Sequence, residues 1–363
     1  MTTSPSSPAE PPLSPVFPPA SSSSSSVKCP CVLKPAGVRN RSLAEARTAG
    51  RWRAVVEGGR VRRAITVTTL APGMIAVRLE GPPALLERMG LQVAAAPQAA
   101  RTAKQLAWIS LDPRRFSGSV VQGEALLDPC AAPAGGERAG TCVRINGGYF
   151  NYRQRACSAQ PEPRPIGPLN TAGGRQQPAL PVPSAFAGDY HQMMFADGSS
   201  FASAPLLAER GEPVFGIKAA GNPMYRLPPD FCFERGDLVP PGVLWHAHDA
   251  NPRAAISLPS SAGSGRIRLV AAPMGDRSCA DSGWTLTAFS AAMARLDRQQ
   301  SPPNVSLNLD GGESVALLAW VGGRPLLDVR QTLQPRRVGN LVEFHDGPPQ
   351  RSPRMVRCVK LET

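Results

Sequence analysis

The segment 144–150 ends a predicted strand with residues whose types suit the binding of a polar ligand. Asn146 offers a hydrogen-bond donor and an acceptor without charge. The following Gly147 and Gly148 let the backbone turn sharply and let its N–H groups approach a ligand closely. We therefore expect Asn146, these two glycines and the adjacent Tyr149 to contact a substrate, although for this segment alone a plain turn is the more frequent explanation.

The segment 307–314 brings a carboxylate to a tight turn. Asp310 closes an alternating strand, and Glu313 follows three residues later. Two carboxylates on one turn can have their pKa values pushed apart, which gives one acid and one base or nucleophile. An Asp-Gly hairpin turn explains the segment about as well. The candidate catalytic residues are Asp310 and Glu313, and the candidate substrate-binding residues are Gly311, Gly312 and Ser314.

A third segment, at 246–256, combines histidine, aspartate and arginine. His246 and His248 lie at i and i+2 beside Asp249, and this set could ligate a divalent metal if both histidines share one face of a strand. The sequence shows no further ligands at metal-binding spacing, so the metal is a candidate cofactor only. Arg253 is a planar cation next to an apolar strand, which suits it to hold a phosphodiester through two hydrogen bonds.

Short alternating or β-branched runs predict a strand-dominated protein. The expected strands are 64–70, 74–79, 143–146, 267–272, 305–310 and 314–321, and the first two are separated by an Ala-Pro-Gly turn. A helix is expected after Thr285, a good capping residue, because apolar side chains recur at helical spacing through Leu296. A second, short helix is predicted at 82–89. The predicted class is α+β, with a strand-dominated mixed sheet and few helices.

Composition divides the chain into four parts. Residues 1–26 are almost wholly Ser, Thr, Pro and small apolar residues, which cannot bury enough surface to offset the entropy of ordering, so a disordered leader is predicted. A basic linker at 27–59, a folded domain at 60–345 and a basic tail at 346–363 follow. No apolar run approaches the ~18–20 residues that span a bilayer, so no membrane span is expected.

The charge and cysteine content limit the partners. The net charge of +13 favours anionic partners, but the basic residues are scattered and no aromatic-basic platform is present, so we expect a small anionic substrate and no nucleic acid. The eight cysteines contain no CxxC pair, which disfavours a zinc ribbon or a thioredoxin-like motif. Cys130, Cys142 and Cys157 cluster around the first glycine segment and could be bridged in an oxidising compartment, but free thiols are expected where no export route is predicted.

The N-terminal leader bears on localisation. It shows no basic segment followed by an apolar stretch, so no ordinary secretory signal is predicted. Its polar, Ser/Pro-rich and acid-poor composition resembles the N-terminal addresses of bacterial type III secreted effectors, although a plain disordered tail or a transit-like segment is the more frequent explanation. We expect a bacterial protein that is either cytoplasmic or exported by a route without a cleaved Sec signal. A host target is a candidate partner if the protein is secreted.

The order of the motifs resembles the phosphodiester glycosidase family, which includes the enzyme that uncovers mannose 6-phosphate. The matching islands are Asn-Gly-Gly-Tyr-Phe at 146–150, Pro-Arg-Ala-Ala-Ile at 252–256, Asp-Ser-Gly-Trp-Thr-Leu at 281–286, Asn-Leu-Asp-Gly-Gly at 308–312 and a closing strand at 337–342. The resemblance covers about residues 60–345 and adds Ser282 and Gly283 as candidate substrate-binding residues. It departs at Ser257, where the family usually has Gly, and at Glu313, where it usually has a third Gly before Ser.

The resemblance implies hydrolysis of a sugar-1-phosphodiester at the anomeric carbon–oxygen bond. The phosphodiester is a good leaving group, so it needs protonation less than an ordinary glycoside does. Arg253 is expected to hold the phosphate, Asp310 the attacking water or the developing positive charge, and Glu313 to be a second carboxylate. Two alternatives remain: a phosphodiesterase that attacks phosphorus, with or without a metal, and a secreted effector that binds a host ligand without turnover.

Overall fold

The structure, a computed structural model, describes residues 65–81, 104–123, 126–133, 140–151, 164–172, 179–215, 222–232, 239–260, 265–274, 283–347 and 353–357. All of them belong to one compact unit of the chain. The predicted leader at 1–26, the linker at 27–59 and the short helix at 82–89 lie outside the described residues. Within those ranges no helix has both the length and the apolar character needed to cross a membrane.

Eight strands form the larger sheet, and each neighbouring pair is antiparallel. In sheet order they are β1 (Ile65–Ala71), β2 (Met74–Gly81), β3 (Lys104–Leu111), β13 (Ile267–Ala272), β12 (Arg253–Leu258), β14 (Val305–Asn308), β10 (Leu206–Glu209) and β11 (Glu212–Pro213). β1 and β2 form the predicted hairpin, whose turn uses Gly73 at a φ of +81°, a conformation that glycine adopts readily.

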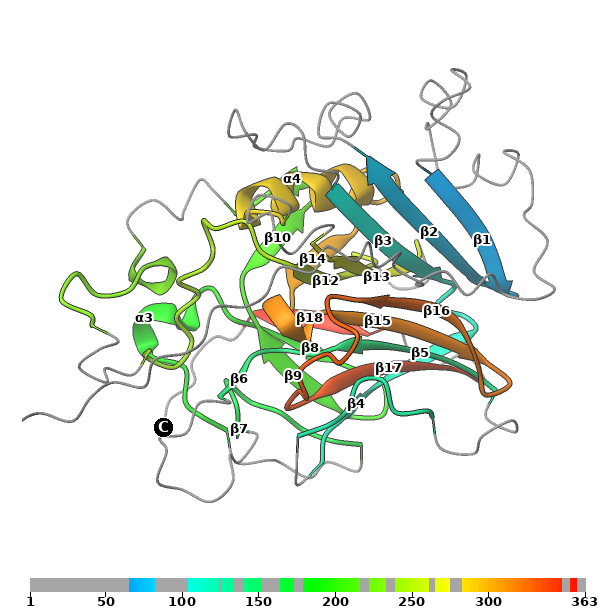
Figure 1. The fold of residues 1–363 in the computed structure, drawn as a ribbon, viewed down its shortest axis with the longest axis horizontal. Coiled ribbons are helices and arrows are strands. Elements are labelled where there is room, and N and C mark those ends of the chain that lie inside the picture. The colour runs from blue at the N-terminus through cyan, green and yellow to red at the C-terminus, as the bar shows by residue number, and fades with distance from the viewer. Residues whose placement is uncertain are drawn as a thin grey trace, which may run out of the picture. The chain divides into compact units, whose positions relative to one another are not determined.

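Five further strands form a smaller antiparallel sheet that faces the larger one (Figure 1). In sheet order they are β16 (Arg324–Arg330), β15 (Ala316–Val321), β5 (Thr141–Asn146), β17 (Leu341–Asp346) and β4 (Phe116–Val121). A three-stranded sheet contains β18 (Arg354–Arg357), β8 (His191–Met194) and β9 (Ser200–Ser203), and a two-stranded one contains β6 (Phe150–Asn151) and β7 (Arg164–Pro165). β18 lies inside the predicted tail; the domain boundaries stay a prediction.

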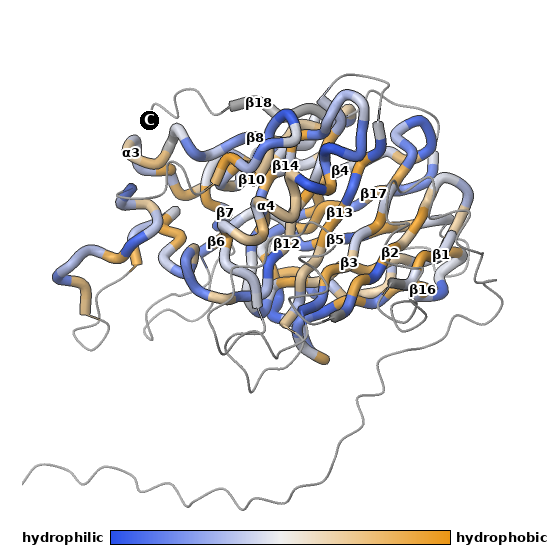
Figure 2. Tube along the Cα trace, turned by 90° about the horizontal axis from the view of Figure 1, so that it is seen from above, coloured by the Kyte–Doolittle hydropathy of each residue, from blue (hydrophilic) through white to orange (hydrophobic). Residues whose placement is uncertain are grey.

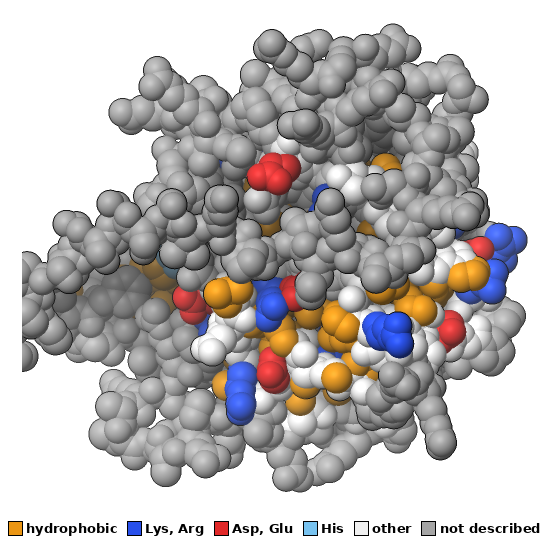
Figure 3. Space-filling model, turned by 45° about the vertical axis from the view of Figure 1, so that its right-hand side comes forward, with side chains coloured by type: hydrophobic (Ala, Val, Ile, Leu, Met, Phe, Trp, Pro, Cys, Tyr) orange, Lys and Arg blue, Asp and Glu red, His pale blue; other side chains and the backbone are white. Residues whose placement is uncertain are grey.

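Apolar side chains of the two main sheets form the core between them. Pleating sends successive side chains of β12 to opposite faces, so Ala254 and Ile256 pack with β5 residues such as Val143, whereas Ala255 packs on the other face. The strands in the middle of Figure 2 are accordingly coloured largely as hydrophobic. On the molecular face drawn in Figure 3, basic, acidic and apolar side chains lie interspersed.

The helix α4 (Leu286–Asp297) covers the outer face of the larger sheet (Figure 1). Thr285 caps it, since its hydroxyl accepts a hydrogen bond from the Ala288 N–H at 3.2 Å. Fully buried apolar side chains line its inner face: Leu286, Phe289, Met293 and Leu296. The helix predicted from the sequence and its cap are therefore confirmed. The other helical segments of the described ranges are α3 (Ser184–Ala187) and the 3₁₀ turns η4 (Pro223–Tyr225) and η6 (Gly312–Ser314).

The prediction of a mixed sheet is wrong for the described strands, which form antiparallel sheets. β13 and β14 run in the same direction, as the strand–helix–strand order through α4 indicates. They are not neighbours, however, because β12 lies between them and is antiparallel to both. The named strands therefore pair only in antiparallel fashion. The strand predicted at 314–321 also begins later, at Ala316, because 312–314 form the turn η6.

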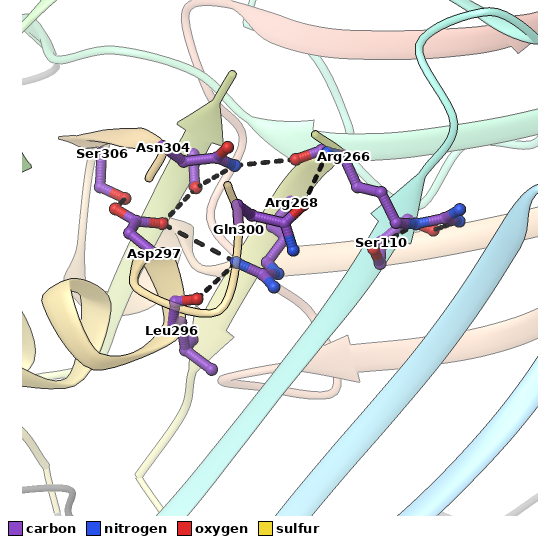
Figure 4. Close-up of polar contacts among 9 residues, drawn as sticks. Ser110, Arg266, Arg268, Leu296, Asp297, Gln300, Asn304 and Ser306 are labelled. Atoms are coloured by element: carbon purple, nitrogen blue, oxygen red, sulfur yellow. Dashed lines mark hydrogen bonds and ion pairs between the residues drawn. The ribbon is translucent and has the colours of Figure 1, made fainter. Parts of the chain in front are cut away.

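A buried polar network joins α4 to the strands that carry the motif residues (Figure 4). Asp297 accepts hydrogen bonds from the hydroxyls of Ser257 at 2.6 Å and Ser306 at 2.5 Å, and Arg268 lies 3.9 Å away. Burial raises the pKa of Asp297 to about 6 and lowers that of Arg268 to about 10, so removal from water outweighs their mutual attraction. Ser257, which stands where the resemblance predicts Gly, thus helps to fix β12 against α4.

Candidate active site

Three motif segments that lie far apart in the sequence meet where the chain passes from the larger to the smaller sheet. The Asn146 side-chain Nδ2 donates to the Asp310 carbonyl at 2.7 Å, and the Asp310 N–H donates to the Gly147 carbonyl at 3.0 Å. The Gly312 N–H donates to the carbonyl of Pro252, the residue before Arg253, at 3.1 Å. Hydrogen bonds therefore join the ends of β5 and β14 to the start of β12 around Asp310.

Asn146 is a positioning residue in this arrangement. Its side chain is fully buried, and its Oδ1 accepts from the Ala316 N–H at 3.2 Å while its Nδ2 holds the Asp310 carbonyl. Both ends of the amide are thus occupied by the backbone on either side of the 310–314 turn. These two hydrogen bonds fix the position of Asp310, and the expected contact between Asn146 and a substrate stays a prediction.

Gly147 and Gly148 are required by close packing rather than by a ligand. The Gly147 N–H donates to the Asn340 carbonyl at 3.0 Å, and the Gly148 N–H donates to Asn340 Oδ1 at 2.9 Å. A Cβ on Gly147 would collide with Asn340 Oδ1, and one on Gly148 would collide with the Ala202 carbonyl. Their N–H groups, expected to bind substrate oxygens, are therefore already satisfied. Asn340 was missed, although it stands in the Gly-Asn pair before the closing strand.

Asp310 is a buried carboxylate held from several sides. It is 9% exposed, and its Oδ1 accepts from the Gly311 N–H at 3.0 Å. Arg336 lies 3.5 Å from its Oδ2 and also donates to the Ser314 hydroxyl at 2.7 Å. Burial raises the pKa of Asp310 above its ordinary value, while Arg336, Ser314 and the Gly311 N–H act in the opposite direction. Arg336 was not predicted from the sequence, because nothing distinguishes the Arg336–Arg337 pair from the many other basic residues of the chain.

Glu313 does not share the environment of Asp310. It lies exposed on η6, whereas Asp310 is buried, and the groups that shift the pKa of Asp310 do not include it. The pKa of Asp310 is therefore raised by burial and not, as expected, by a neighbouring carboxylate. Gly312 has a φ of +62°, and nothing lies within 4 Å of a Cβ built on it, so the turn is open to solvent on this side.

Arg253 is buried, and two of its three guanidinium nitrogens donate hydrogen bonds to backbone carbonyls. Its Nε donates to the Trp284 carbonyl at 2.8 Å, and its Nη2 donates to the carbonyls of His246 at 2.7 Å and Asp249 at 2.8 Å. Nη1 makes no hydrogen bond to any described residue, and a Cβ on Gly311 would lie 4.0 Å from it. The two-bond clamp expected from the sequence is thus reduced to one nitrogen, on the side of the glycine turn. Burial lowers the pKa of Arg253 to about 10, so it stays charged at neutral pH.

Tyr149 and Asn308 complete the site. The Tyr149 hydroxyl accepts from Asn308 Nδ2 at 2.6 Å, and the same Nδ2 donates to the Ala204 carbonyl at 2.9 Å. Burial and then the charge of Asp310 raise the pKa of Tyr149, while Arg253 opposes them, so the hydroxyl lies within electrostatic reach of both. Asn308 is 1% exposed, and its Oδ1 has no donor among the described residues. Its place at the end of β14, two residues before Asp310, is the signal that could have identified it.

The predicted metal ligands do not come together. His246, His248 and Asp249 lie exposed on a turn rather than on one face of a strand. His246 Nδ1 is 3.0 Å from Asp249 Oδ2, whereas His248 packs near the ring of Phe215. Elsewhere in the described ranges one group has three side chains able to hold a metal ion: Cys142, Glu343 and His345.

The remaining candidates belong to the segment before α4. Ser282 lies outside the described residues. Gly283 packs tightly, since a Cβ on it would lie 2.6 Å from the Asn251 nitrogen, and its carbonyl accepts a hydrogen bond from Lys104. Gly283 therefore supports the loop that Arg253 also binds, through the neighbouring Trp284.

Neither a family model nor a curated protein matches the chain. Among solved structures, a putative exported protein from Burkholderia pseudomallei aligns at a TM-score of 0.50 and 12% identity over 77% of this chain and 96% of that one. The catalytic domain of zebrafish N-acetylglucosamine-1-phosphodiester alpha-N-acetylglucosaminidase, auto-inhibited by its pro-peptide, aligns at 0.44 and 13% over 77% and 85%. A hypothetical protein from Synechocystis aligns at a TM-score of 0.42 and 15% identity over 77% of this chain. The present chain covers 64% of the length of that protein. The Burkholderia alignment concerns the fold alone.

Proposed function

We propose that the protein hydrolyses a sugar-1-phosphodiester, or a nucleotide-sugar-like relative, at the anomeric carbon–oxygen bond. The observation that carries the proposal is the meeting of the motif segments around one buried carboxylate. Asn146 bonds the backbone of Asp310 although the two lie 164 positions apart, and Gly312 bonds Pro252 beside Arg253. In the family that these segments resemble, the same positions carry the signature residues.

The charges around Asp310 suit an anionic substrate. Arg336 lies 3.5 Å from the carboxylate, and Tyr149 lies within electrostatic reach of both Asp310 and Arg253. Arg336 pairs with the Asp310 carboxylate, and Arg253 Nη1 lies on the side of the glycine turn. A guanidinium there suits the single negative charge of a phosphodiester.

The single buried carboxylate favours a substrate with a good leaving group. Ordinary glycosidases use two carboxyl groups, one of which protonates the departing oxygen. Glu313, the other carboxylate of this turn, is exposed and is not among the groups that shift the pKa of Asp310. A phosphodiester departs without strong protonation, so Asp310 alone is sufficient for its hydrolysis.

In this proposal each polar group of the site has a role in binding or in the reaction. Asp310 accepts a proton from the attacking water or stabilises the positive charge that develops on the sugar ring. Arg253 Nη1 donates to a phosphate oxygen. The Tyr149 hydroxyl donates to the substrate, and Asn308 Oδ1 accepts from a sugar hydroxyl, which supplies the donor that this buried atom lacks.

The test is hydrolysis of a panel of sugar-1-phosphodiesters and nucleotide sugars in water labelled with heavy oxygen. Label in the released sugar supports the proposal. Label in the phosphate would overturn it in favour of attack at phosphorus. Saturable binding without any product would overturn it in favour of a binding protein.

The variant Asp310→Asn separates this site from contaminating activity. We expect it to lose turnover while its circular dichroism spectrum stays unchanged. The matched control is Glu212→Gln, which removes an exposed carboxylate. Glu212 lies on β11, the edge strand beside β10, and pairs with Arg298. Loss of activity in both variants, or in neither, would remove Asp310 from the mechanism.

A further inference from the structure

We propose that Cys142, Glu343 and His345 form a binding site for a zinc-type divalent metal ion. The three residues lie on two neighbouring strands of the smaller sheet, β5 and β17. Cys142 and His345 face each other directly in the antiparallel register, and Glu343 precedes His345 by two residues and so projects from the same face. Sheet register alone therefore brings a thiol, an imidazole and a carboxylate together.

The distances suit a small tetrahedral ion. The Sγ of Cys142, a ring nitrogen of His345 and a carboxylate oxygen of Glu343 all lie within 4.8 Å of one another. His345 Nε2 is 3.0 Å from Glu343 Oε2. With bonds of about 2.0–2.3 Å, tetrahedral coordination separates such ligand atoms by about 3.4–3.6 Å. Side-chain movements of a few tenths of an ångström to about one ångström would therefore enclose an ion.

The donor set selects the class of metal. Sulfur, nitrogen and one carboxylate oxygen suit zinc and related transition metals, whereas calcium and magnesium prefer oxygen ligands throughout. Three protein ligands leave a fourth position for water or another ligand. The His345 side chain is 48% exposed, which gives an ion access from solvent. Metal binding needs a thiolate and a neutral imidazole, so it releases to solvent the protons that the Cys142 and His345 side chains hold.

A second layer of contacts orients the carboxylate. Arg144 donates from Nε to Glu343 Oε1 at 2.6 Å and from Nη1 to the Pro129 carbonyl at 3.1 Å. This pairing occupies one carboxylate oxygen and leaves Oε2 on the side of His345. Such outer partners are characteristic of metal sites, where they fix the ligand orientation. They also keep the charge balanced, since Arg144 offsets one of the two anionic ligands.

The burial of Cys142 argues against a nucleophilic role for the same three residues. Its residue is 1% exposed and packs with Ala316, Leu318 and Trp320, so a large electrophilic substrate has no access to its sulfur. An ion reaches it from the His345 side without displacing the apolar cluster. The site is also separate from Asp310, because Cys142 lies four residues before Asn146, about 13 Å along an extended strand.

Cobalt(II) binding to the untagged, metal-free and fully reduced protein tests the proposal. We expect one equivalent to bind and to give a thiolate-to-cobalt charge-transfer band in the near ultraviolet. Cys142→Ser and His345→Gln should both lose the band. The matched control Cys232→Ser, which removes a half-buried thiol from another part of the fold, should keep it. Absence of the band from the wild type, or its survival in both ligand variants, would overturn the site.

Thermal unfolding distinguishes a folded variant that has lost the metal site from a variant that fails to fold. His345→Gln changes a partly exposed side chain, so its metal-free melting temperature should stay close to that of the wild type. Zinc should raise the melting temperature of the wild type and of Cys232→Ser, because an ion that binds only the folded state stabilises it. An equal rise in His345→Gln would contradict the assignment even if Cys142→Ser were unfolded.

Discussion

Replacing Asn146 by alanine tests whether this side chain holds Asp310 in place. Its Nδ2 donates to the Asp310 carbonyl at 2.7 Å, and its Oδ1 accepts from the Ala316 N–H at 3.2 Å. Both backbone groups lose their partner in Asn146→Ala, at a position that is fully buried. A buried polar group without a partner costs about 1–3 kcal/mol, so the expected loss in the free energy of unfolding is about 2–6 kcal/mol.

Asn308→Ala is the matched comparison, because Asn308 is also a buried asparagine of the site. It removes donors from the Ala204 carbonyl and the Tyr149 hydroxyl, but it also removes an Oδ1 that has no donor among the described residues. The two lost bonds cost about 2–6 kcal/mol together, and the relief of the unpaired oxygen returns about 1–3 kcal/mol. We therefore expect Asn308→Ala to lower stability by about 1–3 kcal/mol.

Urea unfolding of the two variants and the wild type measures the difference, with unchanged m-values as evidence that the unfolded states are comparable. Asn146→Ala should be the less stable variant by about 1–3 kcal/mol, the relief of the unpaired oxygen in Asn308→Ala. Its activity should fall through kcat because Asp310 is displaced, whereas Asn308→Ala should act mainly on KM. Equal stability of the two variants would refute the scaffold role of Asn146, as would a lower stability of Asn308→Ala.

The remaining predictions concern three carboxylates. Because burial raises the pKa of Asp310, the activity of the wild type should fall on acidification with a midpoint above the value of an ordinary aspartate; a midpoint at or below that value would contradict its role as a base. Glu313→Gln should keep most of its kcat because Glu313 is exposed, and a loss as large as that of Asp310→Asn would contradict the assignment. Burial raises the folded-state pKa of Asp297 from 3.8 to about 6, so the folded protein holds a proton that the unfolded chain releases. Its contribution to the free energy of unfolding therefore falls by about 3 kcal/mol as the pH rises from about 4 to about 6. The stability of the wild type relative to Asp297→Asn should fall across this window in urea titrations, and a constant difference would contradict the raised pKa.

Local sequence signals predicted the elements that depend on neighbouring residues. The α4 helix follows from a capping residue and a helical repeat of apolar side chains, and the β1–β2 hairpin follows from a turn at Gly73. The arrangement of strands depends on contacts that such signals do not contain. β13 and β14 flank a helix as in a parallel unit, and only the placement of β12 between them makes the sheet antiparallel throughout.

The motifs indicated which segments meet around Asp310, but they did not indicate the contacts that the side chains make there. Asn146 has the type of a ligand-binding residue, yet its amide bonds two backbone groups that lie 164 and 170 positions away. The glycine N–H groups are likewise taken by Asn340, 192 positions beyond Gly148. A sequence shows which side chains can bond, but the competing partners become visible only when distant strands are brought together.

The polar atoms that remain free limit the chemistry of the substrate. Arg253 Nη1 and the Tyr149 hydroxyl can donate, whereas the Asp310 carboxylate and Asn308 Oδ1 can accept. An ionised phosphodiester group carries only acceptors, so it cannot by itself satisfy the buried oxygen of Asn308. A sugar attached to the phosphate supplies hydroxyl donors for that oxygen as well as the anion for Arg253. Loss of discrimination between sugar and non-sugar phosphodiesters should therefore accompany Asn308→Ala, because the acceptor that reads the sugar is the atom removed.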